Sequence, residues 1–119
     1  KHLVDRHVST RGYLIGLDKR KLPVRSKHSA LNLVLQSAGA VVMKQATVHL
    51  HEDLWDFPQG SVRQVAHIHD EIQLSAQADI ADAVGQMAAS CIRLAGETLE
   101  LKCPLAGEYR VGKNWCETH

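Results

Sequence analysis

Residues 62–75, VRQVAHIHDEIQLS, restrict the fold more than any other stretch, because two short apolar segments meet there at an acidic tip. Strand-forming side chains on either side of the tip predict a β-hairpin: Val62, Val65, Ile68, Ile72 and Leu74. His69, Asp70 and Glu71 interrupt them at the expected turn. Adjacent carboxylates beside an imidazole are costly to bury and suit a hard cation. Carboxylate pairs at turns are more often simply solvated, so the stretch alone leaves both interpretations open.

The other segments predict an α+β fold with an antiparallel β-sheet. Residues 1–12 show no clear period, whereas 13–17 and 22–25 indicate a basic hairpin whose second strand Pro23 restricts to a sheet edge. Helical periodicity covers residues 27 to about 50 and 78–95, and residues 98–103 alternate like a further strand. This order favours hairpins packed against two main helices, with the sheet covered on one face.

Apolar stripes on the two helices identify the predicted core. The first stripe contains Leu31, Leu35, Ala38 and Val42, and the second contains Ile80, Val84, Met87, Cys91 and Leu94. Gly39 costs about 1 kcal/mol relative to Ala inside a helix, so we expect a close neighbour there. We also expect Gly96 to end the second helix, and Trp55 and Phe57 to anchor the loop at residues 51–61 to the core.

A polar row follows another face of the first helix. His28, Asn32 and Gln36 are spaced four residues apart, which spreads their heads along about 12 Å. Such a row is most often a solvated face. It also suits a ladder of donors that faces a duplex minor groove, where every base pair offers purine N3 and pyrimidine O2 acceptors. Asn and Gln amides can donate to these acceptors without reading the base sequence.

Charge is distributed unevenly, although the net charge is +1. Residues 1–44 contain nine Lys or Arg and two Asp, whereas residues 45–119 contain five Lys or Arg and eleven Asp or Glu. A basic front half suggests an anionic partner such as nucleic acid, or two halves that neutralise each other in the fold. Both interpretations remain open on charge alone.

Cysteine usage and hydropathy indicate the cellular compartment in which we expect the protein to act. The three cysteines are far apart and form no CxxC pair, which predicts a reduced, cytoplasmic protein. No apolar run approaches the length of a membrane span, and no apolar segment typical of a signal peptide follows the charged first residues. Because the chain begins at Lys1 rather than Met, we expect it to be a piece of something longer.

Four motifs in order resemble the C-terminal part of the palm subdomain in family A (polymerase I-like) DNA polymerases, especially the short phage type. GYLIGLDKRKLPVRS at 12–26 resembles the family's hairpin, and HSALNLVLQSAGA at 28–40 resembles its long palm helix. HIHDEIQLS at 67–75 is similar to the third polymerase motif, and GKNWCETH at 112–119 resembles the family's chain end. Together the four cover nearly the whole chain.

The resemblance implies template-directed nucleotidyl transfer by two Mg²⁺ ions in the full protein, with primer-template DNA and dNTP as partners. It implies that Asp70 is one of the two catalytic carboxylates that bind Mg²⁺. It also implies that Glu71 is an auxiliary acid near the metals and that His69 lies beside the primer terminus.

The same resemblance assigns DNA contacts to the front half of the chain. Asn32 and Gln36 would donate to the minor groove of newly formed base pairs, and His28 stands where many relatives have Arg. Arg25 and Lys27 would lie near phosphates.

Several parts of the family pattern are not found in these 119 residues: the first catalytic motif, the fingers helix, the thumb and an exonuclease. We therefore expect residues 1–119 to form a single partial domain that carries half of a metal site and is inactive by itself. An open sheet edge and an uncovered apolar face predict that the fragment self-associates.

Two alternatives remain. A non-catalytic nucleic-acid-binding module would use the same polar row and basic hairpin. A His-rich metal-binding protein or metallohydrolase would use the H-x-H pairs His49/His51 and His67/His69, a spacing that places two imidazoles on one face of a strand. His49 and His51 fall at a predicted helix end, however, where residues two apart do not face each other.

Overall fold

The helices and strands fall into two units, Lys1–Val41 and Val42–His119, and the boundary lies inside one long helix. The computed structural model describes residues 2–119, without the side chains of residues 2–5, 7 and 27. No described helix combines the length and the apolar composition that a bilayer crossing requires.

The first unit contains a helix, a small hairpin and the start of the long helix. Helix α1 (His2–Arg11) leads through Gly12, whose φ is 71°, into strand β1 (Tyr13–Ile15), which pairs antiparallel with β2 (Lys21–Pro23). A 3₁₀ turn (Lys27–Ser29) then precedes α2 (Ala30–Asp53). Leu14 and Ala30 are buried in this unit. The basic hairpin expected from the sequence is therefore confirmed.

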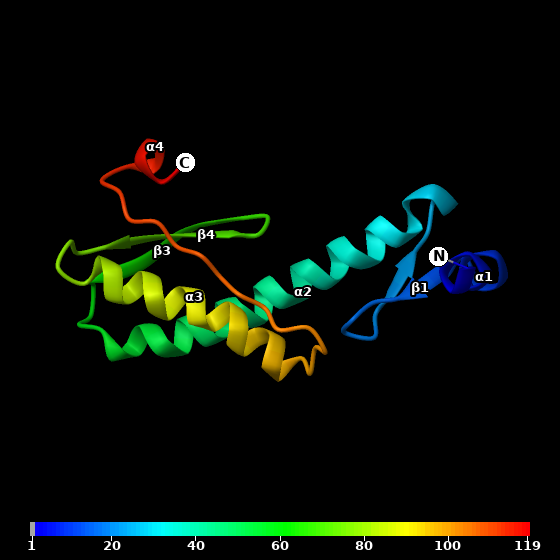
Figure 1. The fold of residues 1–119 in the computed structure, drawn as a ribbon, viewed down its shortest axis with the longest axis horizontal. Coiled ribbons are helices and arrows are strands. Elements are labelled where there is room, and N and C mark those ends of the chain that lie inside the picture. The colour runs from blue at the N-terminus through cyan, green and yellow to red at the C-terminus, as the bar shows by residue number, and fades with distance from the viewer. Residues whose placement is uncertain (1) are drawn as a thin grey trace. The chain divides into compact units, whose positions relative to one another are not determined.

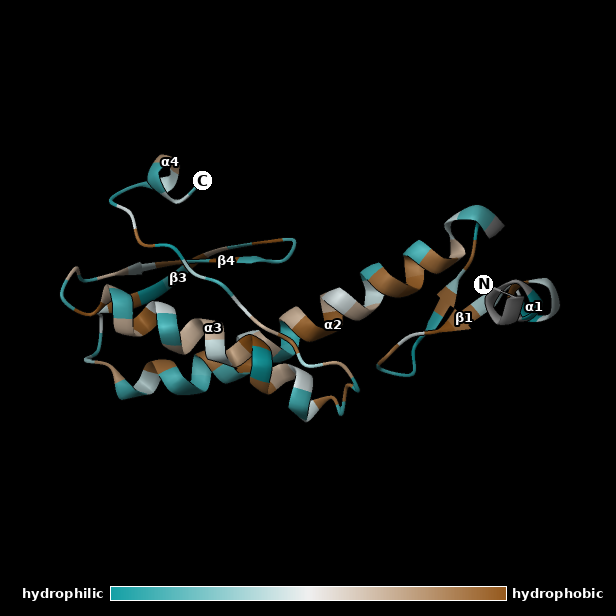
Figure 2. Ribbon diagram, in the orientation of Figure 1, coloured by the Kyte–Doolittle hydropathy of each residue, from teal (hydrophilic) through white to brown (hydrophobic). Residues whose placement is uncertain are grey.

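The second unit carries the second hairpin and the main core. It contains the rest of α2, a 3₁₀ turn (Leu54–Asp56), strands β3 (Val62–Ile68) and β4 (Glu71–Ala76), and helices α3 (Ala81–Thr98) and α4 (Trp115–Thr118) (Figure 1). Apolar residues recur between polar ones along α2 and α3 (Figure 2). The innermost of them form the core: Ala46, Leu50, Cys91 and Ala95. Ile72 and Leu74 of β4 pack against this cluster, so one face of the hairpin covers the two helices.

The chain after α3 returns to the hairpin as an extended tail. Figure 1 shows residues 104–114 running back along α3 before the short helix α4. Close contacts with two glycines hold the tail to α3. A Cβ built on Gly107 would lie 2.8 Å from the Ala89 carbonyl oxygen, and one built on Gly85 would lie 2.2 Å from the Tyr109 ring.

The predicted strand at residues 98–103 is wrong, and so is the expected helix end at Gly96. Helix α3 continues through Thr98, and Gly96 is buried inside it, because Leu105 packs where its side chain would be. The chain then turns at Glu100, which has a φ of 52°, and the Leu101 N–H bonds the Gly96 carbonyl. A six-residue alternation also fits this turn, in which Leu99 and Leu101 are half-buried without a partner strand.

Three expectations about burial are wrong within the described residues. Leu31 and Leu35 are 47% and 62% exposed, so the first half of the α2 stripe is not core, and Leu94 of the α3 stripe is also exposed at 37%. Trp55 is 78% exposed and anchors nothing to the core, whereas Phe57 is half-buried. A Cβ built on Gly39 meets nothing within 4 Å. Periodicity detects the helix, but it does not show which of its faces has a partner.

Candidate functional site

The acidic tip is a two-residue loop, because Ile68 of β3 pairs directly with Glu71 of β4. His69 has a φ of 55°, and a positive φ at the first loop residue is what a type II′ hairpin turn requires. For a residue other than Gly this conformation costs on the order of 1 kcal/mol. Asp70, the second loop residue, is exposed and forms no hydrogen bond or ion pair with the described part of the chain. Its carboxylate is therefore available to a ligand.

A β-bulge sets the register that leads to this tip. The pairing of β3 with β4 shifts between Gln64 and Ala66, so that Val65 is the extra residue. Beyond the bulge, His67 lies opposite Ile72. Ile72 packs against the helices, and because successive strand residues point to opposite faces, Glu71 and Gln73 lie on the other face.

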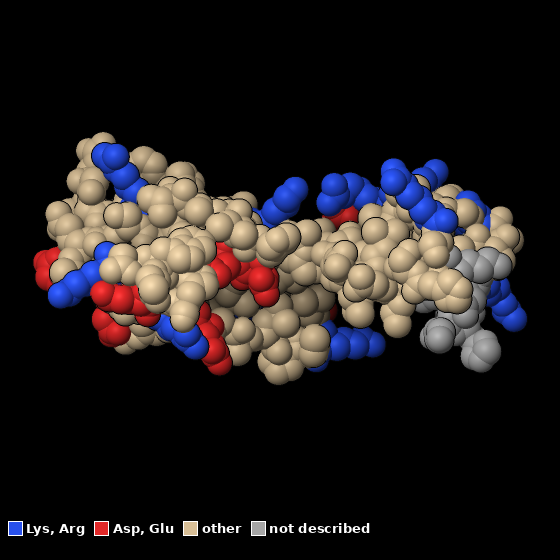
Figure 3. Space-filling view, turned by 90° about the horizontal axis from the view of Figure 1, so that it is seen from above, with Lys and Arg blue, Asp and Glu red and all other residues tan. Residues whose placement is uncertain are grey.

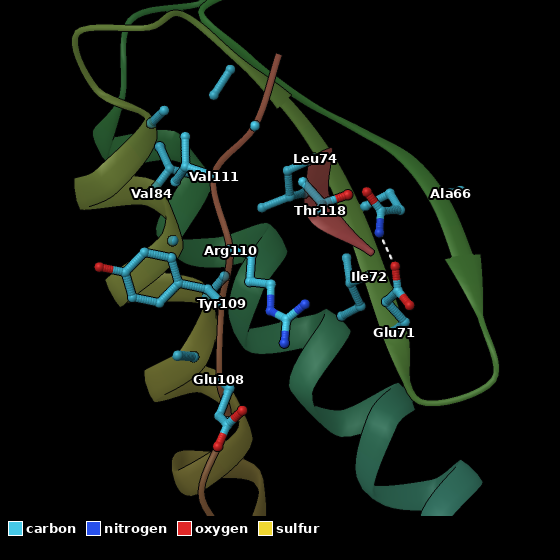
Figure 4. A pocket seen from close by; sticks show the side chains of 18 of the residues that line it. Ala66, Glu71, Ile72, Leu74, Val84, Glu108, Tyr109, Arg110, Val111 and Thr118 are labelled. Carbon is cyan, nitrogen blue, oxygen red and sulfur yellow. Dashed lines mark hydrogen bonds between the residues drawn. The ribbon is translucent and has the colours of Figure 1, made fainter. Parts of the chain in front are cut away.

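Glu71 is engaged on that outer face. The Gln73 amide donates to Oε1 of Glu71, as the dashed line in Figure 4 marks, and His119 Nε2 lies 3.0 Å from the Glu71 carboxylate oxygens. The His119 ring stacks on Trp115 at 4.5 Å between centroids and 8° between planes. The Trp115 carbonyl, 3.1 Å from His119 Nδ1, and the Glu71 carboxylate together raise the pKa of His119 above its usual value.

A cavity of about 860 Å³ lies beside the hairpin, within the second unit. It is lined by β4, α3 and the tail. Figure 4 shows Arg110 extending from the tail into the space between α3 and β4, while the Tyr109 ring lies against α3. The Tyr109 hydroxyl donates to Asp82 Oδ1 at 2.8 Å, and this hydrogen bond raises the pKa of Tyr109 above its usual value.

The tip fits part of a Mg²⁺ site. Mg²⁺ prefers carboxylate oxygens and commonly uses only one or two of them from the protein. Asp70 supplies such an oxygen, and Glu71 supplies a second carboxylate beside it. Among the residues that the structure describes, no three His, Cys, Asp or Glu side chains gather as a metal-binding group.

The H-x-H pairs therefore form no complete ligand set in that part of the chain. His49 contacts Gln45 at 3.2 Å and Thr98 at 3.0 Å, which joins the end of α2 to the end of α3. These contacts give His49 a structural role. The three cysteines are free, with Cys91 buried and the other two exposed.

The predicted DNA-contacting residues lie in the first unit. Asn32 and Gln36 are exposed on α2, and exposed His28 precedes them in the 3₁₀ turn rather than in the helix itself. Arg25 is also exposed, and the side chain of Lys27 lies outside the described residues. The tip and this row belong to different units, and each is a separate part of the candidate site.

The first unit also exposes several basic side chains. Lys19 and Arg20 are exposed in the turn between β1 and β2, Lys21 is exposed at the start of β2, and Figure 3 shows Lys and Arg gathered over the first unit. Arg20 also pairs with Asp18, and Lys21 Nζ lies 5.0 Å from the centre of the Tyr13 ring. This surface is suited to phosphates because most of its cations remain exposed.

Sequence reasoning did not predict the contact between His119 and Glu71. The two residues are 48 positions apart, and no local pattern joins them. The one sequence signal that bears on the position of His119 is its spacing from Trp115. Trp115 and His119 are four residues apart, which places their rings on one side of a helical turn.

Comparisons with known proteins give one consistent result. The family model described as DNA polymerase family A matches residues 1–117. The chain is 39% identical over 128 residues to a DNA-directed DNA polymerase of Escherichia phage Phieco32, covering 98% of the chain and 20% of that relative. It is 40% identical over 118 residues to a DNA-directed DNA polymerase of Enterobacteria phage T3, covering 92% and 16%.

Among solved structures, the fold resembles the POL domain of Pol1 from M. smegmatis in complex with DNA primer-template and dNTP. The TM-score is 0.66 at 18% sequence identity, covering 79% of this chain and 18% of that one. This likeness shows the mixed α+β fold. The chain spans about a fifth or less of the length of the relatives that it matches.

Proposed function

Because this chain belongs to DNA polymerase family A, we propose that it forms the C-terminal part of the palm of a DNA-directed DNA polymerase. The observation that carries the proposal is the exposed Asp70 carboxylate, held at a two-residue hairpin loop without a hydrogen bond or ion pair in the described part of the chain. The phage relatives are DNA-directed DNA polymerases, and the four motifs in sequence order support the same function.

In the longer protein, Asp70 would hold a divalent cation together with a carboxylate from outside these residues. When bound, Mg²⁺ lowers the pKa of the attacking primer 3′-hydroxyl and stabilises the charge on the triphosphate. The short loop fixes Asp70 at the tip, where it remains in solvent until DNA and dNTP cover it. Glu71 adds negative charge beside the cation, and His69, on the same loop, would lie beside the primer terminus.

The first unit would hold the duplex. Asn32 and Gln36 would donate to minor-groove acceptors of the newly formed base pairs, which tests the geometry of a pair regardless of its sequence. His28 would extend this row from the 3₁₀ turn. Arg25 and Lys27 would contact phosphates, which fix the position of the duplex but not its sequence.

Substitution of Asp70 in the longer polymerase tests the catalytic assignment. We expect Asp70→Asn to lower the rate of primer extension by on the order of a hundredfold or more, since metal-assisted stabilisation of the transition state contributes several kcal/mol. Asp79→Asn is the matched control, because Asp79 is also exposed in the second unit but lies away from the tip. Equal rates of primer extension for both variants would reject the catalytic assignment of Asp70, whereas absence of extension by the unsubstituted protein would favour a non-catalytic nucleic-acid-binding module.

The minor-groove assignment predicts a different pattern. Asn32→Ala and Gln36→Ala should each weaken extension on every template sequence and reduce discrimination against mispairs, because each removes a donor that senses pair shape. Steady-state extension from matched and mismatched primer ends measures this. An effect limited to one template sequence would contradict sequence-independent contact.

We propose further that the 119 residues are inactive alone, because they hold half of a two-metal site. A primer-extension assay on the isolated chain should show no incorporation, and clear nucleotide addition would refute this. We also propose that the chain acts in the bacterial or phage-infected host cytoplasm.

The isolated chain should also self-associate. Both two-stranded sheets have open edges, and Val65 and Ile68 of β3 are 64% and 44% exposed. Sedimentation velocity across a concentration series measures the association. A monomer at all concentrations would contradict it.

A further inference from the structure

The last residues of the chain contact the acidic tip through His119, which lies beside Glu71. Helix α4 has only four residues, but reciprocal contacts stabilise its start. Asn114 Oδ1 accepts the Glu117 N–H at 3.2 Å, and Glu117 Oε2 accepts the Lys113 N–H at 2.8 Å. These contacts form a capping arrangement, which fixes the turn from which His119 projects.

Two further contacts fix the His119 ring itself. The ring stacks on Trp115, and Nδ1 lies 3.1 Å from the Trp115 carbonyl oxygen. When Nδ1 donates to that carbonyl, Nε2 faces the Glu71 carboxylate at 3.0 Å. Thr118 Oγ1 lies 3.2 Å from the same Nδ1, and the imidazole thus bridges α4 and β4.

The two carboxylates of the tip therefore differ in what they contact. Glu71 accepts hydrogen bonds from Gln73 and His119, whereas Asp70 forms no such bond with the described residues. Before Glu71 could bind a cation on the oxygens that it now uses, it would have to break these contacts. Asp70 has no such competition.

We propose that His119 is a positioning residue that engages Glu71 and so leaves Asp70 as the carboxylate of the tip that binds a divalent cation. The inference rests on the proposed function only for placing a cation at the tip. The contact of His119 with Glu71 is independent of it. An exposed ion pair of this kind changes a competing equilibrium by about two- to fivefold.

The first experiment tests the contact without metal. The ring ¹⁵N resonances of His119 are recorded by NMR at constant pH in the 119-residue chain. Glu71→Gln and Trp115→Ala should shift the His119 Nε2 resonance, because each removes a partner of the ring. Cys116→Ala is the matched control, because Cys116 is an exposed residue of the same short helix that contacts neither ring. An unshifted resonance in Glu71→Gln overturns the proposal whatever the chain's function.

The second experiment measures Mn²⁺ affinity by electron paramagnetic resonance in a double-mutant cycle. His119→Ala should tighten Mn²⁺ binding by about two- to fivefold more in the wild-type background than in the Glu71→Gln background. In the Glu71→Gln background, His119→Ala changes Mn²⁺ affinity only through the loss of the imidazole charge. The difference between the two effects of His119→Ala therefore measures the contribution of the freed Glu71 carboxylate. Both substitutions change side chains that are 40% exposed, and far-UV circular dichroism verifies that each variant folds.

The outcomes separate the two proposals. A positive coupling supports the role of His119, and equal changes in both backgrounds, or no binding by any variant, overturn it. Asp70→Asn should abolish Mn²⁺ binding at the tip. If binding survives Asp70→Asn while the His119 resonance still responds to Glu71→Gln, the metal assignment of the proposed function fails and the contact stands.

Discussion

The packing of the Tyr109 ring against Gly85 leads to a quantitative prediction about the free energy of unfolding. The Tyr109 ring lies where a side chain at position 85 would be, because a Cβ there would lie 2.2, 2.6 and 2.8 Å from three of its ring carbons. The Tyr109 hydroxyl also bonds Asp82 on the same helix. Replacing Gly85 with Ala therefore forces the ring off α3.

The size of the effect follows from two opposing contributions. Ala inside a helix is about 1 kcal/mol more favourable than Gly. Displacement of the ring loses a hydrogen bond of about 1 kcal/mol and apolar burial of about 1–2 kcal/mol. Gly85→Ala should therefore lower the free energy of unfolding by about 1–2 kcal/mol. In a Tyr109→Ala background the ring is absent, and the same substitution should raise it by about 1 kcal/mol.

Urea denaturation, monitored by circular dichroism at 222 nm, measures this change of sign in four proteins: the unsubstituted chain, Gly85→Ala, Tyr109→Ala and the double variant. Gly39→Ala is the control: it makes the same substitution inside α2, where a Cβ meets nothing within 4 Å. It should stabilise α2 regardless of Tyr109. If Gly85→Ala stabilises the chain in both backgrounds, the ring does not occupy that position and the reasoning fails.

Three further predictions concern titration, thiol reactivity and the core. The hydrogen bond to Asp82 raises the pKa of Tyr109 above its usual value of 10. The contribution of this bond to folding stability is therefore present below pH 10 and is lost as the pH rises through the folded-state pKa. Absorbance at 295 nm should show phenolate formation at a lower pH in Asp82→Asn than in the unsubstituted chain. Burial, and to a smaller extent the neighbouring Asp53, raise the pKa of Cys91 to about 12. Ellman's reagent at pH 8 should therefore modify the two exposed thiols quickly and the Cys91 thiol only after unfolding. Leu50→Ala should cost about 2–5 kcal/mol by thermal denaturation, whereas Trp55→Ala should change stability by less than about 0.5 kcal/mol, and comparable losses would contradict the observed burial.

Local patterns predicted the elements of the site well. The hairpin and its tip were predictable because the signal lies in neighbouring residues: two strand-forming segments flank His69-Asp70-Glu71. The helical period of α2 and α3 is equally local. The family resemblance added the order of the motifs, and the comparisons confirm the family.

Non-local contacts were the part that sequence reasoning could not supply. Whether Leu35 is buried depends on what lies opposite it, and the period of α2 carries no such information. The helix passes Gly96 because Leu105, nine residues later, fills the space beside it. His119 reaches Glu71 only because the tail runs back along α3. Each of these facts depends on residues outside the window that a pattern covers.

The bulge at Val65 has a consequence for how such a chain tolerates insertions and deletions. In a regular hairpin, one residue gained or lost in a strand reverses the facing of every residue between that point and the turn. Here the extra residue is already accommodated in β3, three residues before the end of the strand. A residue gained or lost in β3 before Val65 therefore leaves the pairing between the bulge and the tip unchanged, and with it the position of Asp70 relative to the core-facing Ile72. The bulge thus separates the part of the hairpin whose register can change from the part that sets the position of Asp70.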